Sequence, residues 1–108
     1  EENVILEGKV MVDKGTIIKK GVKIVGPVII GKDCIIENDT MIGENTSIGD
    51  NSHLSYCTIS NSIIMSNCTI EGKLDIKNSI IASNSKIIKE QNENSKKFLL
   101  GEGTQISL

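Results

Sequence analysis

The chain has 108 residues, a formal net charge of −2 and 2% aromatic residues. This length allows a single domain, and the scarcity of aromatic residues excludes an ordinary core built around large rings. The basic residues are all lysines, which argues against a bidentate phosphate or carboxylate site. No run of charge indicates a nucleic-acid or a membrane partner.

The three cysteines, Cys34, Cys57 and Cys68, show no C-x-x-C spacing. We expect them to be small core residues, because free cysteine is often buried. An odd number of cysteines without a signal peptide is typical of the reducing cytosol, so a cytoplasmic location is expected. No apolar run approaches the roughly 20 residues that a membrane-spanning helix needs. The first residue is Glu1 rather than Met, so we expect a fragment or a processed chain.

Aliphatic residues recur at every sixth position through the segment that begins at Val22. They are Ile24, Ile30, Ile36, Ile42 and Ile48. Four residues after each of the first four comes a small or β-branched residue: Val28, Cys34, Thr40 and Thr46. Turn-forming pairs such as Gly26-Pro27 and Asn38-Asp39 lie between them. This period is neither helical nor a simple alternation, so it predicts a repeat protein.

The same period extends upstream to Leu6 and downstream to Ile87, with a few steps of five residues. A strand points alternate side chains to opposite faces, and Gly, Asn and Asp tolerate the positive φ of a corner. Three strands and three corners then close a triangular coil of about 18 residues, and about five coils fit the chain. Three inward columns are predicted: Leu6/Ile24/Ile42/Ile59/Ile76, Val12/Ile30/Ile48/Ile64/Ile81 and Ile18/Ile36/Leu54/Ile70/Ile87.

The residue before each inward aliphatic is expected to point outward. On the second face these residues are Met11, Ile29, Ser47, Ile63 and Ile80, so four of the five are apolar. A contiguous apolar stripe is usually covered by something. Either a second subunit or the chain's own tail covers it, and we favour a second subunit, with Met11, Ile29, Ile63 and Ile80 as interface residues.

The period stops after residue 88. Residues 89–97, KEQNENSKK, are polar and predict a loop. Residues 98–108 return to apolar alternation and predict a tail strand that packs back on the coil, where it would cover unpaired backbone. The expected organisation is therefore a β-helix over 1–88, a loop over 89–97 and a tail strand over 98–108.

Three segments, I-G-K-D-C-I, I-G-E-N-T-S and I-G-D-N-S-H, resemble the motif of the hexapeptide-repeat family. The resemblance implies an all-β fold, a single-stranded left-handed parallel β-helix. The left hand comes from this resemblance, because parallel crossovers in general are right-handed.

Three further segments resemble the C-terminal domain of long-form glucose-1-phosphate thymidylyltransferases and related sugar nucleotidyltransferases. They are the start at 26–31, G-P-V-I-I-G; the coil at 61–70, N-S-I-I-M-S-N-C-T-I; and the tail at 98–106, F-L-L-G-E-G-T-Q-I. The resemblance implies a parent enzyme that joins a nucleoside triphosphate to a sugar-1-phosphate with Mg²⁺ and releases pyrophosphate. Its catalytic residues would lie in an N-terminal α/β domain. This segment would then be a non-catalytic assembly or regulatory domain with no cofactor of its own, and its partners would be further copies and that N-terminal domain.

His53 supports an alternative. The segment His53-Leu54-Ser55-Tyr56 resembles H-L-[ST]-Y in hexapeptide acyltransferases that use acetyl-CoA on amino-sugar phosphates. In that family a histidine is the general base, a role that suits imidazole chemistry. The similarity ends after Tyr56, and the Gly- and Asn-rich segment of that family is missing. A purely structural repeat module is a third possibility.

Overall fold

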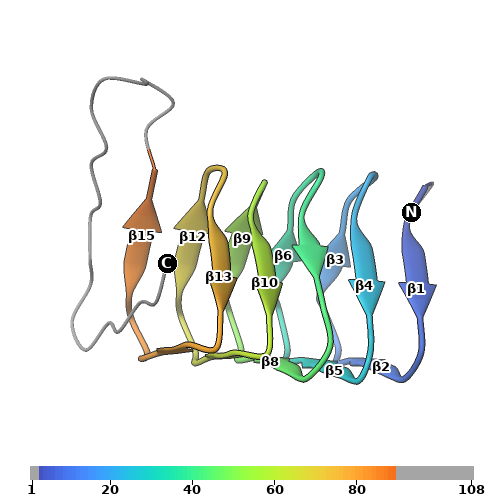
Figure 1. Ribbon diagram of the computed structural model, residues 1–108. Coiled ribbons are helices and arrows are strands. Elements are labelled where there is room, and N and C mark those ends of the chain that lie inside the picture. The colour runs from blue at the N-terminus through green and yellow to red at the C-terminus, as the bar shows by residue number, and fades with distance from the viewer. Residues whose placement is uncertain (1–2, 90–108) are drawn as a thin grey trace.

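The structure, a computed structural model, describes residues 3–89. In that range the chain forms fifteen short strands, which assemble into three parallel sheets of five strands each. Successive strands alternate between the sheets in a fixed order, so each group of three makes one turn of a coil (Figure 1). The predicted all-β parallel coil of about five turns is therefore confirmed.

Each sheet takes every third strand. The first sheet contains β1 (Ile5–Glu7), β4 (Lys23–Val25), β7 (Met41–Ile42), β10 (Thr58–Ser60) and β13 (Asp75–Lys77). The second contains β2 (Val10–Val12), β5 (Val28–Ile30), β8 (Thr46–Ile48), β11 (Ile63–Ile64) and β14 (Ile80–Ile81). The third contains β3 (Ile17–Ile18), β6 (Ile35–Ile36), β9 (His53–Ser55), β12 (Thr69–Glu71) and β15 (Lys86–Ile88).

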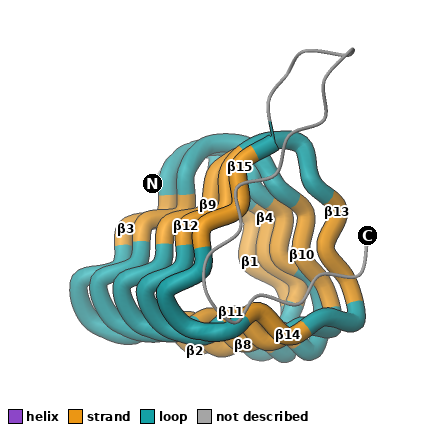
Figure 2. Tube along the Cα trace, turned by 90° about the vertical axis from the view of Figure 1, so that its left-hand side faces the viewer, coloured by secondary structure: helices purple, strands orange, loops and turns teal. Residues whose placement is uncertain are grey.

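The coil is left-handed. In Figure 2 the last turn faces the viewer, and the chain passes clockwise from β13 to β14 to β15. The chain approaches the viewer as it turns, and clockwise advance toward the viewer defines a left-handed path. The hand implied by the hexapeptide resemblance is therefore confirmed.

The register matches all three predicted inward columns. Ile24 pairs with Ile42 in the first sheet, Ile30 with Ile48 in the second and Ile36 with Leu54 in the third. From the second coil onward these columns are almost fully buried. Leu6 and Val12 keep their register but are 53% and 39% exposed. Both lie in the first coil, whose strands are the sheet edges, so one side of each lacks a neighbouring strand.

Corners are made by residues that accept a positive φ. Asp33, Asp39 and Asn45 have φ values of 55°, 61° and 62°, and the same conformation recurs at later corners. Small polar side chains tolerate this region better than other non-glycine residues. Tyr56, with φ of 60°, is the exception, and it sits in the first of the five-residue steps, between Leu54 and Ile59.

The small buried position two residues before each inward aliphatic carries hydrogen bonds between coils. Thr16 Oγ1 donates to the carbonyl of Gly31 at 2.6 Å and accepts from Cys34 N at 3.0 Å. Two coils later Ser52 Oγ donates to Met65 O and accepts from Cys68 N. Polar side chains therefore fit this interior column, because each buried hydroxyl has a partner.

The predicted tail lies almost wholly outside the described residues. β15 ends at Ile88 and the description ends at Lys89, so the loop over 89–97 and the tail strand over 98–108 stay predictions. Among the described residues, no helix is long and apolar enough to cross a bilayer.

Candidate functional site

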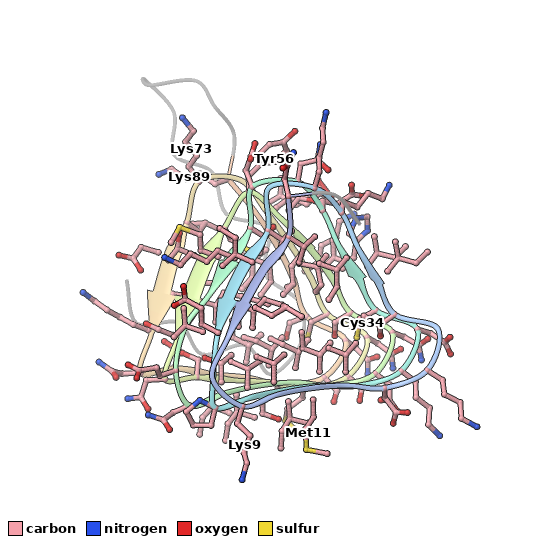
Figure 3. The ribbon with its side chains drawn as sticks, turned by 90° about the vertical axis from the view of Figure 1, so that its right-hand side faces the viewer. Lys9, Met11, Cys34, Tyr56, Lys73 and Lys89 are labelled. Atoms are coloured by element: carbon pink, nitrogen blue, oxygen red, sulfur yellow. The ribbon has the colours of Figure 1, made fainter. Side chains whose placement is uncertain are left out.

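The outer face of the second sheet carries a stripe of exposed apolar side chains. Met11 is 62% exposed, Ile29 56%, Ile63 47% and Ile80 53%, with the half-buried Ser47 in the middle. The strand register places all five in one column. Figure 3 shows Met11 pointing away from the coil, whereas Cys34 lies inside its outline. The exposure predicted for this stripe is confirmed.

A second outward column follows one residue after each inward aliphatic of the same sheet. Its members are Asp13, Gly31, Gly49, Met65 and Ala82. The two glycines place no side chain beside the apolar stripe, and Met65, the next residue of this column, is 44% exposed. Backbone packing requires glycine at position 49, because a Cβ there would lie 2.7 Å from Met65 C and Ser66 N.

Two hollows flank the stripe. The first, about 490 Å³, opens at Gly31 and is lined by apolar groups such as Met11 and Ile29, with Asp13 and Asp50 among its other residues. The second, about 370 Å³, lies on the other side, against Ile63 and Ile80. It is lined by the corner asparagines Asn45, Asn61 and Asn78 and by Ser62 and Ser79. The face therefore combines an apolar ridge with recesses on both sides.

His53 lies on the outer face of the third sheet, away from both hollows. Its Nε2 is 2.9 Å from Oε2 of Glu37, and Lys19 Nζ is 3.6 Å from Oε1 of the same carboxylate. His53 begins β9, while Lys19 and Glu37 directly follow β3 and β6 of the same sheet. The three side chains form a charged cluster that is part exposed, because the side chains of His53 and Glu37 are 37% and 29% exposed.

Glu37 is held in its ionised form by this cluster. The hydrogen bond from His53 is the largest cause of a lowered pKa for Glu37, and the charge of Lys19 lowers the pKa further. An ionised carboxylate only accepts hydrogen bonds, so Nε2 of His53 carries a hydrogen in this pair. Nδ1 is then the ring nitrogen that could take up a proton from an acceptor substrate.

The three cysteines are free and fully buried, as predicted. Burial raises the pKa of the Cys57 thiol to about 12, and it also raises the pKa of Cys34 and Cys68. Thiols of this kind react slowly, because the thiolate is the reactive form. They serve as core residues.

Residues 3–89 bring together no group of three or more His, Cys, Asp or Glu side chains that could hold a metal ion. The Mg²⁺ implied for the parent enzyme therefore has no fitting set of ligands among these residues.

A comparison with known protein families shows which family the chain belongs to. The family described as "GMPPB C-terminal domain" matches residues 24–107, well over half of the chain. The chain belongs to this family. The GMPPB C-terminal domain is the C-terminal domain of a sugar-1-phosphate nucleotidyltransferase. No curated protein sequence matches the chain.

Membership of the GMPPB C-terminal domain family confirms the predicted relation to sugar-1-phosphate nucleotidyltransferases. The matched range starts at Ile24, in β4, and so covers the second to fifth coils of the described structure. The narrower prediction of a thymidylyltransferase is not decided by this match.

Sequence reasoning found His53 and the apolar stripe but missed their surroundings. Lys19 and Glu37 each follow an inward aliphatic by one residue, so the alternation rule, applied forward as well as backward, places them on the face of His53. The same rule finds Gly31 and Met65 beside the stripe. The spacing of residues in the sequence does not tell which of these side chains contact one another.

Proposed function

We propose that this chain is the non-catalytic assembly domain of a larger sugar-1-phosphate nucleotidyltransferase. The transfer of a nucleotide to a sugar-1-phosphate, with release of pyrophosphate, takes place in an N-terminal catalytic domain that uses Mg²⁺. The β-helix holds copies of the enzyme together. Family membership supports the parent activity, and the three free thiols fit a reducing cytoplasm.

The apolar stripe on the second sheet is the observation that carries the assembly role. Its four apolar members are each about half exposed, in one column across five strands. Removing side chains of this size from water contributes up to about 1.5–3 kcal/mol each. Monomeric proteins rarely leave such a patch open, and a second subunit satisfies it.

Sedimentation of the 108-residue chain tests this role. The double variant Ile29→Ser/Ile63→Ser should shift the self-association equilibrium toward monomer, with an unchanged far-UV spectrum. Ile17→Ser/Met41→Ser is the matched control, because these two residues are each 46% exposed but lie on the other two sheets. Loss of association in the control alone, or in neither variant, would contradict the assignment of the interface.

The nucleotide specificity is a separate part of the proposal. We assign the parent as a glucose-1-phosphate thymidylyltransferase on the similarity at 26–31, 61–70 and 98–106. The full-length enzyme, offered glucose-1-phosphate with each common nucleoside triphosphate, should release pyrophosphate fastest with dTTP. Turnover confined to another nucleotide would overturn this assignment and leave the assembly role intact.

The geometry around His53 favours one alternative function, that of an acyltransferase. A histidine paired with a carboxylate at 2.9 Å has the orienting partner that a general base needs. Acetyl-CoA should then raise the melting temperature of the chain saturably, and His53→Ala should abolish the shift. The assembly proposal predicts no saturable shift in either protein.

A further inference from the structure

We infer that two copies of this chain pair through the outer faces of their second sheets with their coil axes antiparallel, so that Met65 of each fills the hollow at Gly31 of the other. This inference rests on the proposed assembly role and adds to it a partner, an orientation and a register.

The apolar column is nearly symmetric about its middle. From the first coil to the fifth it runs Met11, Ile29, Ser47, Ile63, Ile80. A two-fold axis parallel to β8 and lying over Ser47 carries the first coil onto the fifth coil of the facing copy, and the second onto the fourth. Apolar residues then face apolar residues, and Ser47 faces its own copy. Such self-complementarity is what a two-fold interface requires.

The second column supplies the shape. The same axis carries the fourth coil onto the second, so Met65 stands opposite Gly31, where the hollow of about 490 Å³ opens. A flexible thioether side chain suits an irregular recess. Gly49 meets its own copy, and Asp13 faces Ala82 at the end of the face. A protruding residue and a recess thus lie at equal distances on either side of the same middle strand.

Charge at this face favours a second copy over a charged partner. Of the ten positions in the two columns, Asp13 carries the single charge. At the rim, Lys14 faces Ser83 and Lys32 faces Ser66. Asp50 faces its own copy, but it is exposed, so solvent and salt reduce that repulsion.

The other two-fold axis, parallel to the coil, is less favourable. It would set Met65 against Ile63 of the facing copy in the fourth coil. In the neighbouring third coil it would leave Ser47 opposite Gly49. A bulky contact beside a gap packs poorly, because protein interfaces are about as dense as protein interiors. The antiparallel arrangement avoids both faults.

The strength of this pairing follows from its size. Stable interfaces bury about 800 Å² per partner, and a face of five short strands is small by that standard. We therefore expect a dissociation constant in the micromolar range, about 1–100 µM.

Charge substitutions at Met65 test the register. In the pairing, residue 65 enters a hollow that Asp13 and Asp50 of the facing copy help to line. Met65→Asp should weaken dimerisation by at least about tenfold, whereas Met65→Lys should keep it or strengthen it. Residue 65 is exposed in the monomer, so the monomer melting temperatures of the two variants serve as the folding control. Equal dissociation constants for the two variants would overturn the register.

Cross-linking tests the orientation independently. Packed sheets lie about 10 Å apart, so the thiols of two Ser47→Cys chains would be within reach of a short bismaleimide. Thr58→Cys, exposed on the first sheet, is the control, and the native thiols are buried. We expect covalent dimer with Ser47→Cys and none with Thr58→Cys. Met11→Cys should also give none, because the antiparallel arrangement sets the two copies of Met11 at opposite ends of the face, whereas the axis parallel to the coil would bring them together. A wild-type chain that stays monomeric at millimolar concentration would refute the assembly role itself. A wild-type dimer without the Ser47→Cys product would refute the antiparallel arrangement alone.

Discussion

The outer faces of the second and third sheets begin alike and then diverge. In the first two coils both outward columns carry apolar residues, Met11 and Ile29 on the second sheet and Ile17 and the half-buried Ile35 on the third. The second sheet carries Ser47 in the third coil and then Ile63 and Ile80 in the fourth and fifth. The third sheet carries His53, Thr69 and Lys86 in the same three coils.

The inward columns of the same two sheets do not diverge in this way. They are aliphatic in every coil, because each inward residue packs on the coil before and the coil after it. Packing thus dictates the interior, while the outward positions are free to differ. Residues with a function in this fold are therefore to be sought in the outward columns, one sheet at a time.

The largest expected effect comes from a charge in an inward column. Ile36→Asp should unfold the chain, because an unpaired buried carboxylate costs several kcal/mol and Ile36 has no exposed surface. Ile35→Asp, one residue earlier and outward, should melt within a few degrees of wild type. The measurement is thermal melting followed by far-UV circular dichroism. An unchanged melting temperature for Ile36→Asp would show that the column is misplaced.

A smaller effect is expected at Gly49, which follows the inward residue of β8 in the second sheet. Gly49→Ala should lower the free energy of unfolding by about 1–3 kcal/mol, because the new Cβ would press on backbone atoms of the next coil at 2.7 Å. Gly43→Ala on the first sheet is the control. Its nearest neighbour would be Ser60 Cβ at 3.1 Å, a side-chain atom, so the loss should be clearly smaller. Urea unfolding compares the two, and equal losses would argue against the close approach at Gly49.

The interior was predictable from the sequence because one rule, alternation within short strands, fixes every inward position. The corners were predictable for a similar reason, since Asn, Asp and Gly mark positive φ. Tyr56 was not, because a five-residue step moved the corner onto a residue that gives no such signal.

The outer site was only half predictable. The alternation of inward and outward residues predicted that the stripe and His53 are exposed. Contacts between columns depend on side-chain conformations, which the spacing of residues does not encode. The pairing of Glu37 with His53 and Lys19, and the recess at Gly31, therefore needed the structure.

A substitution at the strained corner of Tyr56 is expected to stabilise the fold. Tyr56→Asn should raise the free energy of unfolding by about 1 kcal/mol, because asparagine adopts the left-handed region more readily than tyrosine. The reverse change at a regular corner, Asn67→Tyr, should cost a similar amount. Urea unfolding at neutral pH measures both, and a loss of stability in Tyr56→Asn would show that the ring of Tyr56 makes contacts worth more than the strain.

The smallest effect concerns the charged cluster on the third sheet. The pKa of Glu37 is lowered in the folded chain, chiefly by its hydrogen bond to His53. Its contribution to stability is therefore present above the ordinary carboxylate pKa and is lost as the pH falls through the lower, folded-state pKa. Because the pair is part exposed, this contribution should stay below about 1 kcal/mol.

Glu37→Gln measures that contribution. Its stability should fall less than that of wild type between neutral and acidic pH, by this small amount. The variant should leave self-association unchanged, because Glu37 lies on the third sheet. If the stability of the wild type falls between neutral and acidic pH by no more than that of the variant, the pair contributes nothing to folding.

Sedimentation equilibrium of the wild-type chain, from about 1 µM to about 1 mM, tests most directly whether the apolar face of the second sheet joins copies of this protein. The weight-average mass should rise with concentration from that of the monomer toward twice that value. A mass that stays at the monomer value across the whole range would contradict the account.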